Sequence, residues 1–234
     1  MTDAAGEALF RPVRSGNAFE DTVSRLLQTI RLGIVQPGSA LPSERDLATR
    51  FSVSRDTVRE AISELAAAGY VVSRRGRYGG TFVCEVLPAP SPSIELSAAE
   101  IEDVIGLREI LEVGAVRAAA RRPLTASERD GLWSRLTETA AASSEDYRRL
   151  DSRFHLAIAE VAGTPSLVSL VADSRSRIND LLDRIPLLPP NLAHSNQQHE
   201  AIVDAILRGD EETAAAAMGE HLEGSAALLR GFLG

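Results

Sequence analysis

A proline- and serine-rich stretch, VLPAPSPSIELS at residues 86–97, divides the chain into two parts of different character. Proline fixes φ and lacks a backbone N–H, so three prolines in twelve residues disfavour both a helix and a central strand. Short β-rich runs occur before this stretch, whereas helical periodicity dominates after it. We therefore expect a loose N-terminal arm, two folded units and a linker, at residues 1–16, 17–86, 98–234 and 87–97 respectively.

The composition favours packing of helix on helix in a reducing compartment. Aromatic residues make up only 4% of the 234 residues, so Ala, Leu, Val and Ile must build the core. Cys84 is the single cysteine, which excludes an intrachain disulfide. No apolar run approaches the roughly 20 residues of a membrane helix, and the N-terminus lacks the apolar stretch of a signal peptide. These features predict a soluble cytoplasmic protein without a membrane partner.

Residues 17–86 contain three helical segments followed by an arginine-tipped hairpin. Apolar stripes predict helices over residues 17–33, after Ser43 and from Ser54. Ser43, with Asp46 three residues later, is typical of a helix N-terminus. The β-rich runs YVVS and TFVCEV flank RRGRYGG, which predicts a hairpin with a basic, glycine-rich tip. This order of elements predicts a winged helix-turn-helix domain.

The third helix, which begins SRDTVRE, is the candidate recognition helix. Its two arginines are four residues apart and share one face, and arginine pairs bidentately with guanine in the major groove. Hydroxyls near a helix N-terminus suit phosphate oxygens. The net charge of −8 argues weakly against nucleic acid, but locally clustered arginines can override it. The candidate DNA contacts are Arg45, Ser54, Arg55, Thr57, Arg59, Arg75 and Gly76.

The segment GIVQPGSALPSERDLATRFSVSRDTVREAISELAAAGYVVSRRGRYGGTFV resembles the DNA-binding domain of GntR-family bacterial transcription regulators. The resemblance covers essentially all of residues 17–83. It implies that the arginines of SER and SRDTVRE contact operator bases or backbone. It also implies that the wing tip, with Arg75 and Gly76, enters the minor groove. We expect a homodimer on a double-stranded, inverted-repeat operator, because two-fold symmetric proteins read two-fold symmetric sites.

The second part of the chain is expected to be an all-α bundle of six or seven helices, which makes the fold mainly α. Glycine and proline separate the predicted helices, and alanine-rich turns allow close helix packing. Residues 185–198 leave room for a seventh helix. The six helical patterns lie near residues 98–121, 126–141, 145–162, 165–184, 192–208 and 210–230.

Three of the four histidines fall on the apolar stripes of three different predicted helices, and one has an aspartate four residues before it on the same face. Buried imidazoles and carboxylates need polar partners. One carboxylate and three imidazoles suit a divalent transition metal, with Zn preferred and Ni, Mn or Fe(II) as alternatives. From spacing alone, hydrogen-bonded core histidines are an equally good interpretation. The candidate metal ligands are Asp151, His155, His199 and His221, and His194 is left outside the site.

The segments LREILEVGAVRAAA, DSRFHLAIAEVAG and HEAIVDAILRGDEETAAAAMGEHL resemble the FCD ligand-binding domain of the FadR-like branch of the GntR family, over about residues 98–230. The resemblance implies a divalent metal held by the four candidate ligands and an effector, often a small organic acid, that completes the coordination. It also implies that Arg108 faces the pocket, where its guanidinium group would suit a carboxylate. Arg175 and Asn179 are weaker effector contacts, for which a solvated helix face is an equal alternative.

Three functions compete at this point. The first is a regulator, expected to be a repressor, whose operator affinity changes when a small organic acid binds. The second is a metal-dependent hydrolase or lyase with a DNA-binding appendage, but the chain lacks HExxH, an HD dyad and a pair of ExxH motifs. The third is a regulator with a purely structural metal. We expect the first and no enzymatic activity.

Overall fold

The computed structural model describes residues 10, 18–76, 79–88, 97–185, 187 and 189–233. The chain separates into two compact units, Met1–Ser91 and Pro92–Gly234. The boundary between them falls within the predicted linker at residues 87–97. Most of the predicted arm and residues 89–96 of the linker lie outside the described residues.

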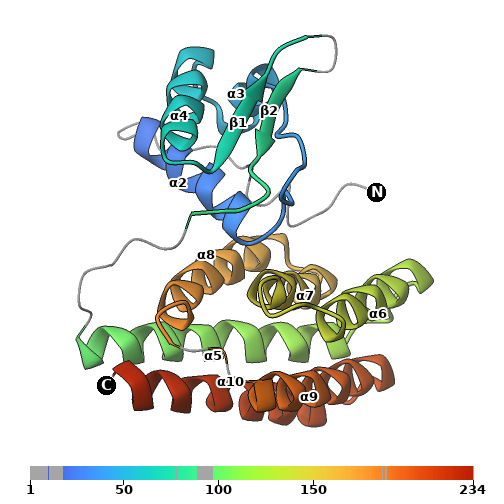
Figure 1. Ribbon diagram of the computed structural model, residues 1–234. Helices are drawn as coiled ribbons and strands as arrows, with labels where there is room; N and C mark the ends of the chain where they lie inside the picture. The colour runs from blue at the N-terminus through green and yellow to red at the C-terminus, as the bar shows by residue number, and fades with distance from the viewer. Residues whose placement is uncertain are drawn as a thin grey trace. The chain divides into compact units, whose positions relative to one another are not determined.

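In the described residues of the first unit, three helices precede a two-stranded hairpin, which confirms the winged helix-turn-helix prediction (Figure 1). β1 and β2 pair antiparallel, with Val71 opposite Val83 and Arg74 opposite Gly80. Residues 77–78 of the predicted hairpin tip lie outside the described part. The elements are α2 (Ala18–Arg31), α3 (Glu44–Phe51), α4 (Arg55–Ala67), β1 (Val71–Arg74) and β2 (Gly80–Val83).

The apolar stripes of α2, α3 and α4 meet in one core, to which Val58, Ile62 and Leu65 of α4 contribute as predicted. Phe10 also belongs to this core, although it lies in the arm that we expected to be loose. Its ring packs against Phe51 of α3 with a centroid separation of 5.6 Å. The prediction of a loose arm is wrong at this position, because burying an aromatic ring removes a large apolar area from water.

In the described residues, the second unit consists of helices alone, as predicted (Figure 1). α5 packs against α8 and α7 and also against α10 and α9, so it runs through the middle of the unit. The helices are α5 (Ala98–Ala120), α6 (Ala126–Ala140), α7 (Tyr147–Val161), α8 (Pro165–Leu182), α9 (Pro189–Arg208) and α10 (Glu211–Leu233).

All six helices begin and end within about three residues of their predicted bounds, and the largest differences are at the end of α10 and at the start of α9. The start of α9 bears on the predicted seventh helix. This helix begins at Pro189 and not near residue 192, so it takes up most of the stretch where a seventh helix could have formed. Proline fits the first positions of a helix because the N–H groups there have no intrahelical partner. α8 ends before the PLLPP segment, at Leu182, and α9 begins within that segment.

Candidate functional site

Asp151, His155, His199 and His221 converge in the second unit from α7, α9 and α10. One ligand atom from each lies within 4.8 Å of all the others. His199 Nε2 lies 3.3 Å from His221 Nε2 and 3.4 Å from Asp151 Oδ1, and His155 Nε2 lies 3.7 Å from the same oxygen. Ligand atoms about 2.1 Å from one divalent ion are separated by roughly 3–3.5 Å at tetrahedral or octahedral angles. The spacing of the four side chains therefore fits a single ion.

Two of the three imidazoles have an oxygen atom at Nδ1, which orients Nε2 toward the cluster. His155 Nδ1 lies 2.5 Å from Glu112 Oε2, and His221 Nδ1 lies 3.2 Å from Gln198 Oε1. An Nδ1–H group directed at an oxygen fixes the tautomer in which Nε2 carries the lone pair. This is the arrangement in which a histidine binds a metal through Nε2.

Glu112 of α5 joins two buried arginines to the cluster. Arg108 Nε donates to Glu112 Oε1 at 3.1 Å, and Arg175 Nη1 lies 3.7 Å from the same oxygen. Arg175 Nη2 also donates to Asp151 Oδ2. Because buried charges are costly unless they are paired, the two carboxylates and two guanidinium groups stabilise one another. Arg175 is wholly buried, which excludes the solvated helix face that we had left open for it.

The electrostatic environment gives three of the four candidate ligands the protonation states that a metal requires. Burial alone would raise the pKa of Asp151, but the charge of Arg175 outweighs it and holds the pKa well below its usual range. Burial lowers the pKa of His199 to about 3 and that of His221 well below its usual range. At neutral pH these groups are an ionised carboxylate and two neutral imidazoles, which are the forms that bind divalent ions.

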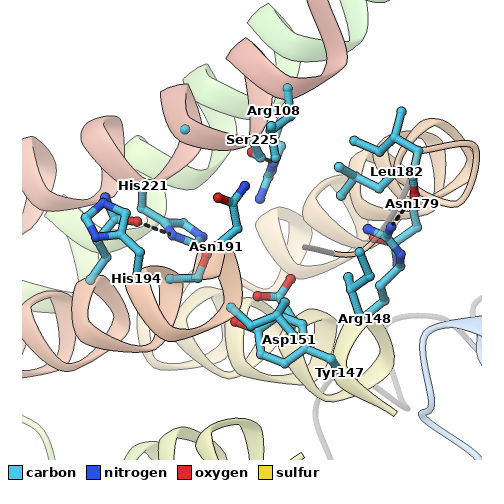
Figure 2. Close-up of a pocket in the computed structure, with 17 residues that line it drawn as sticks. Arg108, Tyr147, Arg148, Asp151, Asn179, Leu182, Asn191, His194, His221 and Ser225 are labelled. Atoms are coloured by element: carbon cyan, nitrogen blue, oxygen red, sulfur yellow. Dashed lines mark hydrogen bonds between the residues drawn. The ribbon is translucent and has the colours of Figure 1, made fainter. Parts of the chain in front are cut away.

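A cavity of about 240 Å³ opens onto one side of the cluster (Figure 2). Asp151 and His221 line it, so the cluster faces this space. Arg108 also lines the cavity, as predicted, and donates to Ser225 Oγ through Nη1 at 2.7 Å. Figure 2 shows His221 on one side of the cavity and Leu182 on the other. A ligand in this space would have the candidate metal on one side and a wall that includes Leu182, Asn179 and Arg148 on the other.

Other lining residues extend or modify the predicted set. Asn179, a candidate effector contact, lines the cavity, and its Nδ2 donates to Ser152 Oγ at 2.8 Å. Arg175, predicted beside it, instead holds Asp151 from within the core. His194, which we left outside the metal site, lines the cavity but is not part of the four-residue cluster.

Sequence reasoning missed Glu112, Gln198 and Arg148. Glu112 was within reach, because it lies four residues after Arg108 on a helix and a buried arginine needs a carboxylate partner. Gln198 is the neighbour of His199 in the sequence, yet it serves His221 on another helix. Nothing in the local sequence of Arg148 marks it as a cavity residue.

In the first unit, the candidate recognition helix presents exposed arginines, while its apolar face is buried. Arg55 and Arg59 are both exposed, as their spacing predicts. Arg59 makes ion pairs with Asp56 on the same helix, at 3.0 Å, and with Glu44 of α3, at 3.3 Å. The side chain of Arg59 is still 57% exposed, so these surface pairs leave it accessible to DNA.

The remaining candidate contacts lie at helix ends and in the wing. Ser54 caps α4 by accepting a hydrogen bond from the Thr57 N–H, and the two hydroxyl oxygens lie 2.8 Å apart. Arg45 is 80% exposed at the start of α3. Arg75 is exposed, and Gly76 beside it has a φ of 110°, a conformation that favours glycine. The structure thus places all seven predicted contacts at the surface or at a helix N-terminus of the winged unit.

The fold defines a class of transcription regulators that combine a winged helix-turn-helix unit with an all-helical unit. Comparison with known families agrees, since residues 19–83 match "Bacterial regulatory proteins, gntR family" and residues 103–224 match "FCD domain". The chain belongs to the GntR family, in its FadR-like branch.

Relatives of the chain carry the same class of function in their names. The "Putative L-lactate dehydrogenase operon regulatory protein" of Escherichia coli K12 is 30% identical, covering 90% of this chain and 84% of the relative. The HTH-type transcriptional repressor NanR of Cronobacter sakazakii is also 30% identical, covering 94% and 89%. The solved structure of E. coli McbR/YncC shares the fold with a TM-score of 0.58 at 20% identity, covering 92% of this chain and 97% of that one.

These relatives are transcription regulators and not enzymes, so the hydrolase or lyase alternative is set aside. Among the described residues, no helix is long and apolar enough to cross a membrane.

Proposed function

We propose that this chain is a repressor whose affinity for operator DNA is set by a small organic acid bound at a divalent metal in the helical unit. The observation that carries the proposal is the convergence of four buried ligand atoms within 4.8 Å, beside a cavity lined by arginine. A closed structural site would need no such cavity, whereas a site with a free coordination position does.

Asp151, His155, His199 and His221 would hold the ion, with Zn preferred and Ni, Mn or Fe as alternatives. When bound, the ion supplies Lewis-acid coordination positions for an oxygen ligand. Arg108 lines the same cavity and would pair with the carboxylate of the effector. Asn179 would offer a hydrogen bond from a second wall, while Arg175 would orient Asp151.

The metal proposal is tested by elemental analysis of protein purified without added metal and without a histidine tag. We expect about one equivalent of a transition metal per chain in the parent and less than about one tenth in His199→Ala, because losing one of four ligands removes much of the affinity. Equal metal content in the parent and the variant would reject the site. His194→Ala is the matched control, since His194 lies outside the cluster.

For the winged unit, we propose that a homodimer binds an inverted-repeat operator through Arg45, Arg55 and Arg59, with the wing tip in the minor groove. Arg55→Ala should weaken operator binding by about 1–3 kcal/mol and relax specificity at one base pair. Equal operator affinity of variant and parent across a range of salt concentrations would reject the assignment of α4 as the recognition helix.

Regulation requires a free-energy coupling between the two sites, typically about 1–3 kcal/mol. We expect a screen of carboxylic acids against metal-loaded protein to find one that weakens operator binding about 5- to 150-fold. His199→Ala should keep operator affinity but lose this response. A purely structural metal predicts a different outcome, in which chelation lowers stability and no acid changes operator affinity.

Repression itself is tested by deleting the gene, which should raise expression of a reporter placed behind the operator.

A further inference from the structure

We propose that the effector is a dianion, a dicarboxylate whose second carboxylate is read by Arg148, so that this residue sets specificity against monocarboxylates of the same size. The inference rests on the proposed function and names the chemical class of the ligand. Three features of the second unit support it: the charge balance of the site, the position of Arg148, and the side of the cluster that faces the cavity.

The charges around the cavity cancel before a metal is added. Arg108 and Arg175 are buried with Glu112 and Asp151, which makes two positive and two negative charges. The ion pair of Arg148 with Asp183, the residue that follows α8, adds no net charge. A divalent ion held by neutral imidazoles therefore leaves a surplus of two positive charges at a buried site. Uncompensated buried charge is costly, so a dianion matches this site better than a monoanion does.

Arg148 is a second guanidinium in the cavity wall, apart from the candidate metal ligands. It lines the cavity from α7, three residues before Asp151. Its Nε lies 3.0 Å from Asp183 Oδ1, and its Nη2 donates to the Ile185 carbonyl at 3.2 Å. These contacts fix the side chain by its Nε and Nη2 edge. The Nη1 group carries two further N–H groups, which can donate hydrogen bonds to a ligand carboxylate.

The open side of the cluster gives the ligand its orientation. His155 and His199 are enclosed, whereas Asp151 and His221 line the cavity, so an incoming acid reaches the ion past these two residues. Figure 2 shows His221 on one side of the cavity and Arg148 on the other. A carboxylate that coordinates the ion would thus leave the far end of a short acid facing Arg148. A carboxylate at that end would accept hydrogen bonds from the Nη1 group of Arg148, and a methyl group could not.

The experiment compares malate with 2-hydroxybutyrate, two four-carbon 2-hydroxy acids that differ in a terminal carboxylate against a methyl group. Both are titrated into metal-loaded protein by calorimetry. We expect malate to bind at least about 10-fold more tightly, as a charge-assisted pair with arginine implies. In Arg148→Gln the ratio of the affinity for malate to the affinity for 2-hydroxybutyrate should fall below about 3, with the metal content unchanged. Arg148→Lys should restore part of the preference, because it returns the charge without the planar fork.

Arg149→Gln is the matched control. Arg149 is the next residue on α7 and also makes an ion pair, with Asp146 at 2.7 Å, but it is not among the residues that line the cavity. This variant should keep the parental ratio. Because the ratio compares two acids on one protein, general loss of stability does not change it. If Arg148→Gln fails to fold, the parental ratio and Arg148→Lys still decide.

The experiment distinguishes a failure of the Arg148 assignment from a failure of the proposed function. If both acids bind the parent equally, if 2-hydroxybutyrate binds more tightly, or if the preference survives in Arg148→Gln, the assignment of Arg148 to a second carboxylate is wrong while the regulator proposal stands. If metal-loaded protein binds neither these acids nor any other carboxylic acid in the screen, the proposed function itself is wrong.

Discussion

Glu112 lies outside the four candidate ligands, yet its carboxylate contacts His155 and both buried arginines of the site. Burial alone would raise the pKa of Glu112, but its contact with His155 and the charges of Arg108 and Arg175 outweigh burial and hold the pKa well below its usual range. The residue therefore stays ionised at neutral pH. It both orients an imidazole and balances two guanidinium groups.

Replacing Glu112 by glutamine tests this double role. The change removes a buried anion while it keeps the shape of the side chain. We expect metal affinity to fall about 10- to 100-fold, as for other partners of metal-binding histidines. The free energy of unfolding should fall by about 3–5 kcal/mol, because Arg108 and Arg175 lose their shared partner. Chelator competition and urea denaturation measure the two effects. Glu109→Gln, at an exposed position of α5, should change neither, and unchanged metal affinity in Glu112→Gln would contradict the role.

The imidazoles make the stability of the metal-free protein depend on pH. Burial lowers the pKa of His199 to about 3, whereas an unfolded histidine titrates near its ordinary value of 6.5. Between these values the unfolded chain binds a proton that the folded chain does not, so the free energy of unfolding falls as pH falls below 6.5. Urea denaturation between pH 7.5 and pH 5 should show this loss in chelator-treated protein. His199→Gln should reduce the slope of the free energy of unfolding against pH. A slope equal to that of the parent would show that His199 does not contribute to this pH dependence.

At the scale of the element, the ends of the helices depend on a few positions with special backbone geometry. Gly163 follows α7 with a φ of +75°, where a side chain is strained, and a Cβ there would lie 2.8 Å from Arg122 Nε. That arginine is held by the Val161 carbonyl and by Glu128. The glycine therefore lets the chain turn sharply between the helix that carries Asp151 and α8.

Alanine substitutions at two glycines should have opposite effects. Gly163→Ala should lower the free energy of unfolding by about 1–2 kcal/mol, because alanine is strained at positive φ and contacts a tethered arginine. Gly131 lies within α6, and a Cβ there would meet nothing within 4 Å. Gly131→Ala should raise the free energy of unfolding by about 0.5–1 kcal/mol through better helix propensity. Chemical denaturation measures both, and effects of the same sign would contradict this account.

Local signals were sufficient to predict the elements but not the contacts between them. Helix periodicity located the helices of the second unit, and i, i+4 spacing put Asp151 and His155 on one face. The contact of His155 with Glu112 depends on how α7 packs against α5, which no local pattern encodes. For the same reason, spacing predicted that Arg175 points to one side of α8 but could not show that Asp151 is its partner.

At the scale of the whole molecule, the chain divides the work between two units with separate cores. The candidate DNA contacts and the four candidate ligands lie in different units. A bound ion stabilises only the unit that holds it, by an amount that grows with the ratio of its free concentration to its dissociation constant. Metal removal should therefore act on one unit directly and on the other only through regulation.

Trp133 makes this division measurable, because it is the single tryptophan of the chain and lies in α6 of the helical unit. Chelation should lower the thermal unfolding midpoint that tryptophan fluorescence reports. An ion whose free concentration is 1,000 times its dissociation constant adds about 4 kcal/mol to the free energy of unfolding. Operator binding at low temperature, measured by fluorescence anisotropy of labelled DNA, should persist in the chelated protein. His199→Ala should already have the lowered midpoint and should not respond to chelator. If chelation abolished operator binding while the tryptophan midpoint stayed constant, the ion would belong to the winged unit, and the assignment of Asp151, His155, His199 and His221 as its ligands would be wrong.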